Sequence, residues 1–170
     1  MTFCKDGNVT PQATATTGGP RAKARSAHRD AWGALTRAHA AIVGRLQEAL
    51  AAADFPPLPW YEVLATVAEA PEQRMKMGDL AEALVITRGG LTKLVDRLVK
   101  AGLLERTFCE TDRRVSYATL CRAGADLLEE MRPVVVAELK VAFVSKLSDD
   151  EADVLRETLE RVRVSACGGE

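Results

Sequence analysis

The hydrophobic residues of this chain recur mainly at three- and four-residue spacing, the pattern of helices that bury one face. One such stripe, Ser26–Ala53, predicts a long helix. The proline-rich run Phe55–Pro59 should end it, because proline disrupts a helix interior. A second helix is predicted over about Pro59–Ala70. Residues 1–25 carry few large apolar side chains, so we expect a flexible tail there.

The pattern next predicts two helices joined by a tight turn. Met75–Met77 alternates apolar and polar residues as a short edge strand does, and Gly78–Val85 has the pattern of a short helix. Thr87 is placed to cap a further helix, Arg88–Ala101, and Gly102 is placed to end it in the left-handed conformation. Two helices joined in this way make a candidate helix-turn-helix.

Two short strands are predicted after these helices, Leu104–Phe108 and Val115–Leu120. The loop between them, Cys109–Arg114, is short and polar, so the strands should form a hairpin that projects as a wing. The expected fold class is therefore mainly α with a small β wing, a winged helix-turn-helix with N- and C-terminal dimerisation helices. We expect one domain over residues 26–165, with the winged lobe at about 59–120.

Two more helices are predicted towards the C-terminus. The first is Arg122–Ser145, and Ser148 with Glu151 forms a capping box that opens the second. We expect the second helix to turn inward a face made of Val154, Leu155, Leu159 and Val162. The apolar stripes of residues 122–164 and 26–53 are larger than the small lobe can cover. They therefore predict a homodimer.

Composition fits one mostly helical domain. The 170 residues are 47% hydrophobic but only 5% aromatic, which suits helices packed by aliphatic seams. No apolar run approaches the roughly 18 residues that span a bilayer, and the N-terminus has no signal-peptide pattern. The four cysteines are far apart without a CxxC pair, so we expect reduced thiols and a cytoplasmic protein.

Charge is unevenly distributed although its net value is only −1. Between Ile86 and Arg114 there are seven basic and four acidic residues, whereas Arg122–Glu170 has seven basic and eleven acidic ones. This segregation suits a middle region that faces phosphates and a remote acidic end.

The outward side of the predicted helix 88–101 has the residues of a DNA reader. A helix of this length fits the major groove. Gly89 and Gly90 would let the backbone approach the groove closely. Base edges would be within reach of Arg88, Thr92 and Lys93. Thr87 and Arg97 are better placed for phosphates. Taken alone, the pattern also fits an amphipathic surface helix with solvated charges.

The predicted wing favours the DNA reader. Arg113 and Arg114 would lie at the tip of the hairpin, where guanidinium groups suit the negative potential of a narrow minor groove. Asp112 would support Arg114 by a charge-assisted hydrogen bond. The alternative is an exposed ion pair of the turn, worth under about 1 kcal/mol.

At these residues the chain resembles the MarR family of bacterial transcriptional regulators. The resemblance covers roughly Pro59–Gly124 and rests on five segments of sequence. They are Trp60-Tyr61-Glu62-Val63-Leu64, Met77-Gly78-Asp79-Leu80-Ala81, Thr87 through Leu98, Asp112-Arg113-Arg114, and Leu120-Cys121-Arg122-Ala123-Gly124. Gly78 and Cys121 depart from the family pattern at two helix caps, and neither lies on the proposed DNA face.

The resemblance implies a triangular homodimer that binds a pseudo-palindromic operator in double-stranded DNA, with half-sites about 34 Å apart. It also implies repression that is relieved by a small aromatic or phenolic ligand or by oxidation. The ligand would bind between the dimerisation helices and the DNA-binding lobe, near Trp32, His39, Trp60, Tyr61 and Arg106. We prefer the simpler interpretation that Trp60 and Tyr61 pack the second helix.

Other functions find less support in the sequence. A redox sensor of the family would carry a cysteine near the start of the first long helix, and none lies between Cys4 and Cys109. His28 and His39 have no acid or nucleophile at fixed spacing, and no phosphate loop, cofactor motif or metal-ligand set is present, so we expect no enzyme. The main competing function is a winged-helix module for protein interaction, an adaptor or anti-regulator without specific DNA binding.

Overall fold

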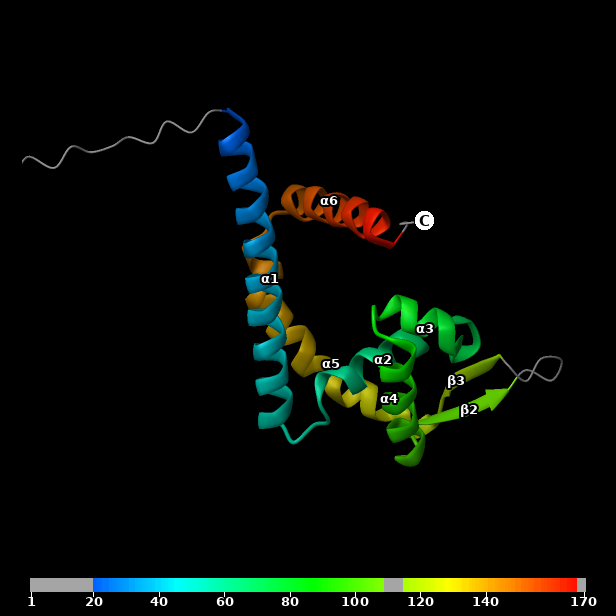
Figure 1. The fold of residues 1–170 in the computed structure, drawn as a ribbon. Coiled ribbons are helices and arrows are strands. Elements are labelled where there is room, and N and C mark those ends of the chain that lie inside the picture. Colours follow the sequence, from blue (N-terminus) through cyan, green and yellow to red (C-terminus); the bar gives the residue numbers. More distant parts are fainter. Residues whose placement is uncertain (1–19, 109–114, 168–170) are drawn as a thin grey trace, which may run out of the picture. The chain divides into compact units, whose positions relative to one another are not determined.

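The computed structural model describes residues 20–108 and 115–167 and divides the chain into two units, Met1–Ala38 and His39–Glu170, which are treated separately (Figure 1). The helices are α1 (Pro20–Ala52), α2 (Leu58–Ala68), α3 (Met77–Ala83), α4 (Arg88–Lys100), α5 (Arg122–Ala142) and α6 (Asp149–Cys167), with 3-10 turns at Pro71–Gln73 and Val144–Lys146. The strands are β1 (Arg74–Lys76), β2 (Leu104–Phe108) and β3 (Ser116–Leu120).

Helix α1 begins earlier than the sequence pattern predicted. It starts at Pro20 instead of about Ser26, so the last six residues of the expected tail are helical. The reason is local, because proline suits the first turn of a helix and Arg21–Ala24 contains only strong helix formers. The part of the predicted tail over residues 1–19 lies outside the described residues.

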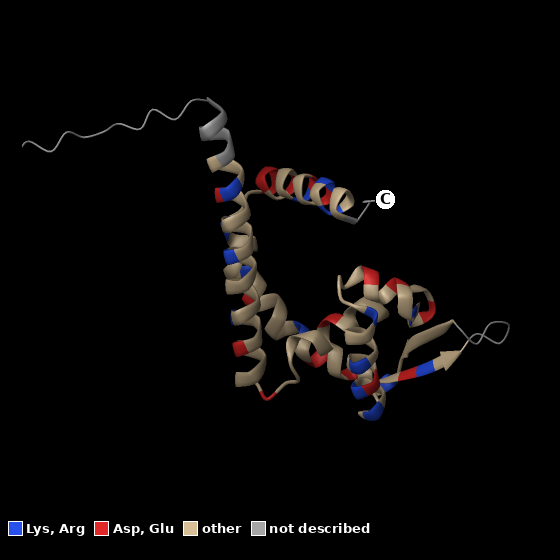
Figure 2. Ribbon diagram, in the orientation of Figure 1, with Lys and Arg blue, Asp and Glu red and all other residues tan. Residues whose placement is uncertain are grey.

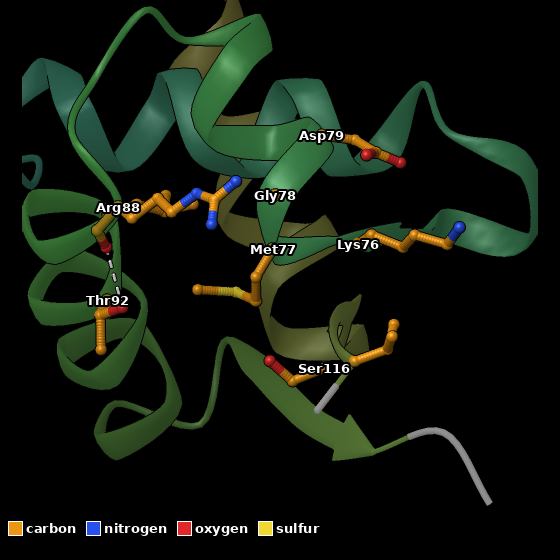
Figure 3. Close-up of a pocket in the computed structure, with 9 residues that line it drawn as sticks. Lys76, Met77, Gly78, Asp79, Arg88, Thr92 and Ser116 are labelled. Atoms are coloured by element: carbon orange, nitrogen blue, oxygen red, sulfur yellow. Dashed lines mark hydrogen bonds between the residues drawn. The ribbon is translucent and has the colours of Figure 1, made fainter. Parts of the chain in front are cut away.

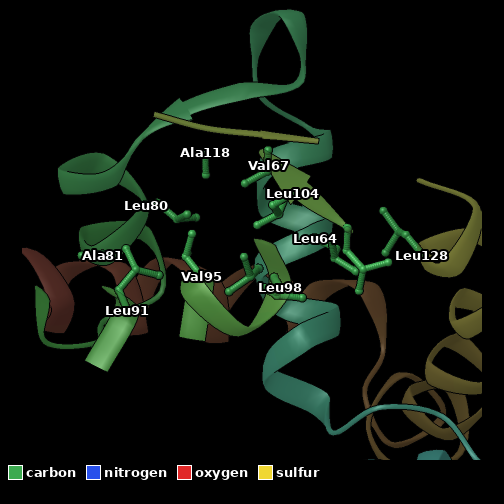
Figure 4. Packing of buried hydrophobic residues seen from close by; sticks show 12 residues of the cluster. Leu64, Val67, Leu80, Ala81, Leu91, Val95, Leu98, Leu104, Ala118 and Leu128 are labelled. Atoms are coloured by element: carbon green, nitrogen blue, oxygen red, sulfur yellow. The ribbon is translucent and has the colours of Figure 1, made fainter. Parts of the chain in front are cut away.

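The winged lobe has a continuous aliphatic core. Helices α2, α3 and α4 and strands β2 and β3 all contribute to it (Figure 4). Its fully enclosed members are Val63, Leu64, Val67, Leu80, Val95, Leu98 and Ala118. This core is the support on which α4 rests.

The sheet has three antiparallel strands in the order β1-β3-β2. Arg74 pairs with Thr119, and Leu104 pairs with Leu120. The predicted strands Leu104–Phe108 and Val115–Leu120 are confirmed to within one residue, and the edge strand begins one residue earlier than expected.

The junction between the sheet and α5 requires a glycine. A Cβ atom on Gly124 would lie 2.2 Å from the carbonyl oxygen of Leu103, far inside contact distance. The same carbonyl accepts a hydrogen bond from the backbone N–H of Cys121 at 3.1 Å. Gly124 therefore lets the start of α5 approach the turn that precedes β2.

A second apolar cluster joins the end of α1 to α5. It consists of Leu46, Leu50, Leu58, Met131 and Val135 with partly buried neighbours. Arg45 on α1 donates to Glu138 on α5 with an N–O distance of 2.8 Å. These contacts are confined to the part of α1 that belongs to the His39–Glu170 unit.

The last helix, α6, begins as predicted but is not buried as predicted. The Ser148 hydroxyl oxygen accepts from the N–H of Glu151, and the Glu151 carboxylate accepts from the N–H of Ser148 at 2.9 Å, which is the expected capping box. The face expected to point inward is only partly covered in the single chain: Val154 is 66% and Val162 54% exposed, whereas Leu155 and Leu159 are partly buried. Among the described residues no helix is long and apolar enough to cross a membrane.

Candidate nucleic-acid interface

Helix α4 is closed at both ends by the residues that the sequence predicted. The Thr87 hydroxyl oxygen accepts a hydrogen bond from the backbone N–H of Gly90 at 3.1 Å, which makes Thr87 the N-cap. The Thr92 hydroxyl donates to the carbonyl of Arg88 at 2.9 Å (Figure 3). Gly102 follows the helix with φ +74°, the left-handed conformation expected of it.

The two faces of α4 differ sharply in burial. Leu91, Val95 and Leu98 point into the core. The opposite face is exposed at Arg88, Gly89, Gly90, Lys93 and Arg97, whereas Thr92 is partly buried. Figure 2 marks the positions of basic residues along this helix in blue. The structure thus brings the predicted major-groove residues together on one rigid, basic surface.

The two glycines of α4 stand in different surroundings. A Cβ atom on Gly89 would meet nothing within 4 Å, so packing within the chain does not require glycine there. A Cβ atom on Gly90 would lie 3.1 Å from the Thr87 hydroxyl oxygen, at the edge of tight contact with the N-cap. Because Gly89 has no side chain, the backbone of α4 is directly accessible in its first turn.

Arg106 links α4 to the two-stranded ribbon formed by β2 and β3, which is called the ribbon below. Its guanidinium lies 3.5 Å from a carboxylate oxygen of Asp96 on α4 and 3.3 Å from the hydroxyl oxygen of Ser116 on β3. It also faces the ring of Phe108 at 5.8 Å. The sequence suggested Arg106 as a ligand-binding residue, and the structure shows it engaged in holding helix and ribbon together.

The other residues suggested for a ligand site lie on α1 and α2. Trp60 and Tyr61 on α2 are partly buried against the core, which agrees with the simpler interpretation of their role. Burial raises the pKa of Glu62 beside them, and the positive charge of His39 lowers it by a smaller amount. Trp32 belongs to the Met1–Ala38 unit, where it is 65% exposed.

A shallow cavity of about 340 Å³ lies between α3, α4 and β3 (Figure 3). Its lining includes Lys76, Asp79, Arg88, Thr92 and Ser116. Among the lining residues the cationic Lys76 on β1 adds to the basic surface of α4, to which Arg88 already belongs.

The wing tip cannot be compared with its prediction. Asp112, Arg113 and Arg114 lie outside the described residues. The strands that flank them, β2 and β3, pair over their full described length.

Sequence reasoning missed three features of this surface. The guanidinium of Arg74 stacks on the ring of Tyr117 at 3.9 Å and fastens β1 to β3. The ion pair between Asp96 and Arg106 joins residues ten positions apart, a spacing with no local signal. Val85 lies just before the N-cap in a positive-φ conformation with its side chain 78% exposed. Only a valine at the end of a short helix pattern hinted at this last feature.

Comparison with known proteins adds an independent finding. A family model described as MarR family matches residues 53–115. The HTH-type transcriptional regulator MhqR of Bacillus subtilis is 33% identical over 87 residues, which is 51% of this chain and 59% of MhqR. The matched stretch therefore spans less than two thirds of that relative.

Solved structures match over more of the chain. AbsC, a MarR family transcriptional regulator from Streptomyces coelicolor, has a TM-score of 0.76 at 26% identity, covering 83% of this chain and 95% of AbsC. Sco3205, a MarR family regulator from the same organism solved in complex with DNA, has a TM-score of 0.76 at 27% identity, covering 82% of this chain and 88% of Sco3205.

Proposed function

We propose that the chain is a member of the MarR family and a sequence-specific DNA-binding transcriptional regulator without enzymatic activity, acting in the bacterial cytoplasm. The observation that carries the proposal is that α4 exposes a basic face while its opposite, apolar face is buried in the core of the lobe. The similarity to Sco3205, which was solved with DNA, supports it.

In the proposed complex α4 enters the major groove. Arg88, Thr92 and Lys93 contact base edges, Thr87 and Arg97 contact phosphates, and Gly89 with Gly90 allows close approach. Arg113 and Arg114, supported by Asp112, reach into the adjacent minor groove. Lys76, which lines the cavity together with Arg88, adds to the positive potential along this surface.

We propose that the regulator is a homodimer on a pseudo-palindromic operator. The domain of residues 26–165 then divides into the DNA-binding lobe and the dimerisation helices. The uncovered apolar faces support this division, since α6 exposes Val154 and Val162 and α5 exposes Val136. Half-sites would be about 34 Å apart.

Repression relieved by a small aromatic or phenolic effector completes the proposal, and it rests on the family alone. Of the residues suggested for that ligand, Arg106 already binds Asp96 and Ser116. An anionic effector at Arg106 would have to compete with Asp96, and so would loosen the link between the ribbon and α4. Titration of the protein–DNA complex with sodium salicylate as probe measures whether such a ligand releases the protein from DNA.

Fluorescence anisotropy tests DNA binding directly. We expect the protein to bind a duplex from its own upstream region more tightly than a scrambled duplex, with affinity falling steeply as salt rises. Arg88→Ala should weaken selective binding, because it removes a base contact. Arg132→Ala on α5, which removes an arginine paired with Glu129 on the same helix, is the matched control.

Equal binding to the operator and the scrambled duplex would contradict the proposal. It would favour the winged-helix adaptor, whose basic face contacts an acidic protein instead of DNA.

A further inference from the structure

Three helices of the chain end in the same way. At the ends of α1, α3 and α4 the backbone N–H three positions beyond the last helical residue donates to a carbonyl oxygen five residues earlier. The donors are Phe55, Ile86 and Leu103, with N–O distances of 2.9, 3.1 and 3.0 Å. This is the Schellman motif, which places one residue of each end in the left-handed conformation.

The left-handed position holds a different residue in each motif. It is Asp54 after α1 with φ 56°, Val85 after α3 with φ 53°, and Gly102 after α4 with φ 74°. Glycine has no Cβ to clash, and aspartate is among the residues that adopt this conformation most readily. Valine is branched at Cβ and is strained there. In the described part of the chain Val85 is the only β-branched residue with positive φ.

Packing against the residues that the structure describes does not compensate for this strain. The Val85 side chain is 78% exposed and takes no part in either apolar cluster, whereas the neighbouring Ile86 is 37% exposed. A strained, exposed side chain with no apolar packing in the described part of its chain therefore suggests a contact outside the chain.

The position of Val85 indicates what that contact is. It lies two residues before the N-cap Thr87 and three before Arg88, at the end of α4 that the proposed function places in the major groove. The C5 methyl of thymine is the apolar group that base edges present in that groove. A second copy of the chain fits poorly here, because it would bring two Arg88 side chains together.

We propose that the Val85 side chain contacts a thymine C5 methyl group in each operator half-site and so contributes to sequence specificity. The proposal rests on the proposed function. In the proposed complex the exposed isopropyl group of Val85 supplies an apolar contact beside the N-terminal end of α4, whose own side chains at Arg88, Thr92 and Lys93 supply only polar and charged contacts.

The test combines a protein variant with a DNA variant. Val85→Gly removes both the methyl groups and the strain, so its melting temperature should rise while its operator affinity falls. Losing one buried methyl corresponds to about 0.8 kcal/mol, or about fourfold in affinity for each half-site. Operator in which deoxyuridine replaces thymidine, one position at a time, lacks only the C5 methyl and should weaken wild-type binding by a similar factor at one position.

The combination of the two changes distinguishes the outcomes. On the deoxyuridine operator of that position, Val85→Gly should bind as well as wild type, because the contact is already absent. Equal losses on both operators would overturn the thymine contact, as would unchanged affinity or a lowered melting temperature. Val85→Thr, which keeps the branching and the strain, should lose affinity without gaining stability.

The two proposals fail differently. If wild type selects its operator and neither change alters binding, the Val85 contact is wrong and the DNA-binding function stands. If wild type does not distinguish operator from scrambled duplex, the proposed function is wrong and the Val85 contact with it.

Discussion

The winged lobe and the helix α6 differ in how far their apolar side chains are buried. In the lobe, Leu64, Leu80 and Leu98 are completely enclosed within one chain. On α6, by contrast, Val154 and Val162 are more than half exposed, and residues 149–166 include no buried side chain. The lobe completes its own core, whereas α6 has an apolar face that one chain leaves uncovered. The difference separates residues that fold the chain from residues that assemble it.

The largest effect is expected from a cavity in the lobe. Leu98→Ala removes a completely buried side chain from the base of α4 and should lower the free energy of unfolding by about 2–5 kcal/mol. Chemical denaturation at low protein concentration measures it. Leu159→Ala deletes the same atoms from the partly exposed side of α6 and should lower it by much less. Similar losses for both variants would remove the distinction between lobe and helix.

A charge on α6 should break assembly and spare the fold. Val154→Asp with Val162→Asp places two carboxylates in the proposed dimer interface, and we expect the dimer to dissociate at least tenfold more readily, about 1.4 kcal/mol. Analytical ultracentrifugation gives the dissociation constant, and circular dichroism checks that the helices remain. A wild-type protein that is monomeric at micromolar concentration would show that the α6 face has another purpose.

Gly89 sharpens the comparison within the lobe, because it is a lobe residue that folding does not require. Gly89→Ala adds a Cβ into open space and should stabilise α4 by about 1 kcal/mol. The same methyl group should weaken operator binding, since it stands between the backbone and the groove. Melting temperature and anisotropy together test this. An alanine variant with unchanged affinity would argue against close approach at this position.

The smallest effect concerns pH and Glu62. Because burial holds the pKa of Glu62 above its usual 4.5, the folded protein binds the proton more tightly than the unfolded chain does. The contribution of Glu62 to the free energy of unfolding is therefore fully present below pH 4.5, and it is lost as pH rises through the raised pKa. Glu62→Gln should remove this loss, which denaturation between pH 4 and neutrality measures. An identical pH profile in the variant would show that Glu62 is not responsible.

The lobe was largely predictable from the sequence because its signals are local. Thr87 and Gly102 mark the ends of α4, and both predicted roles are confirmed by a hydrogen bond and by a positive φ. The two strands of the wing were predicted as short runs on either side of a polar loop, and the α6 cap was predicted from Ser148 with Glu151.

Features set by contacts between distant residues were not predictable. Nothing near Arg106 in the sequence indicates that it binds Asp96, and the family resemblance implied a ligand role for it instead. The burial of α6 was wrong for the single chain, because an apolar stripe indicates that a face needs cover without saying whether the same chain supplies it. Helix α1 begins before its apolar stripe, because its first turn depends on helix propensity and not on apolar periodicity.

The contact of Arg106 with both Asp96 and Ser116 has a consequence for the operator. Since one side chain joins α4 to the ribbon, the two should meet DNA as a single rigid body. The bases read by the helix and those beneath the wing must then keep a fixed helical phase. One inserted base pair turns them apart by about a tenth of a turn. Such an insertion should be tolerated less well than a base substitution at either place.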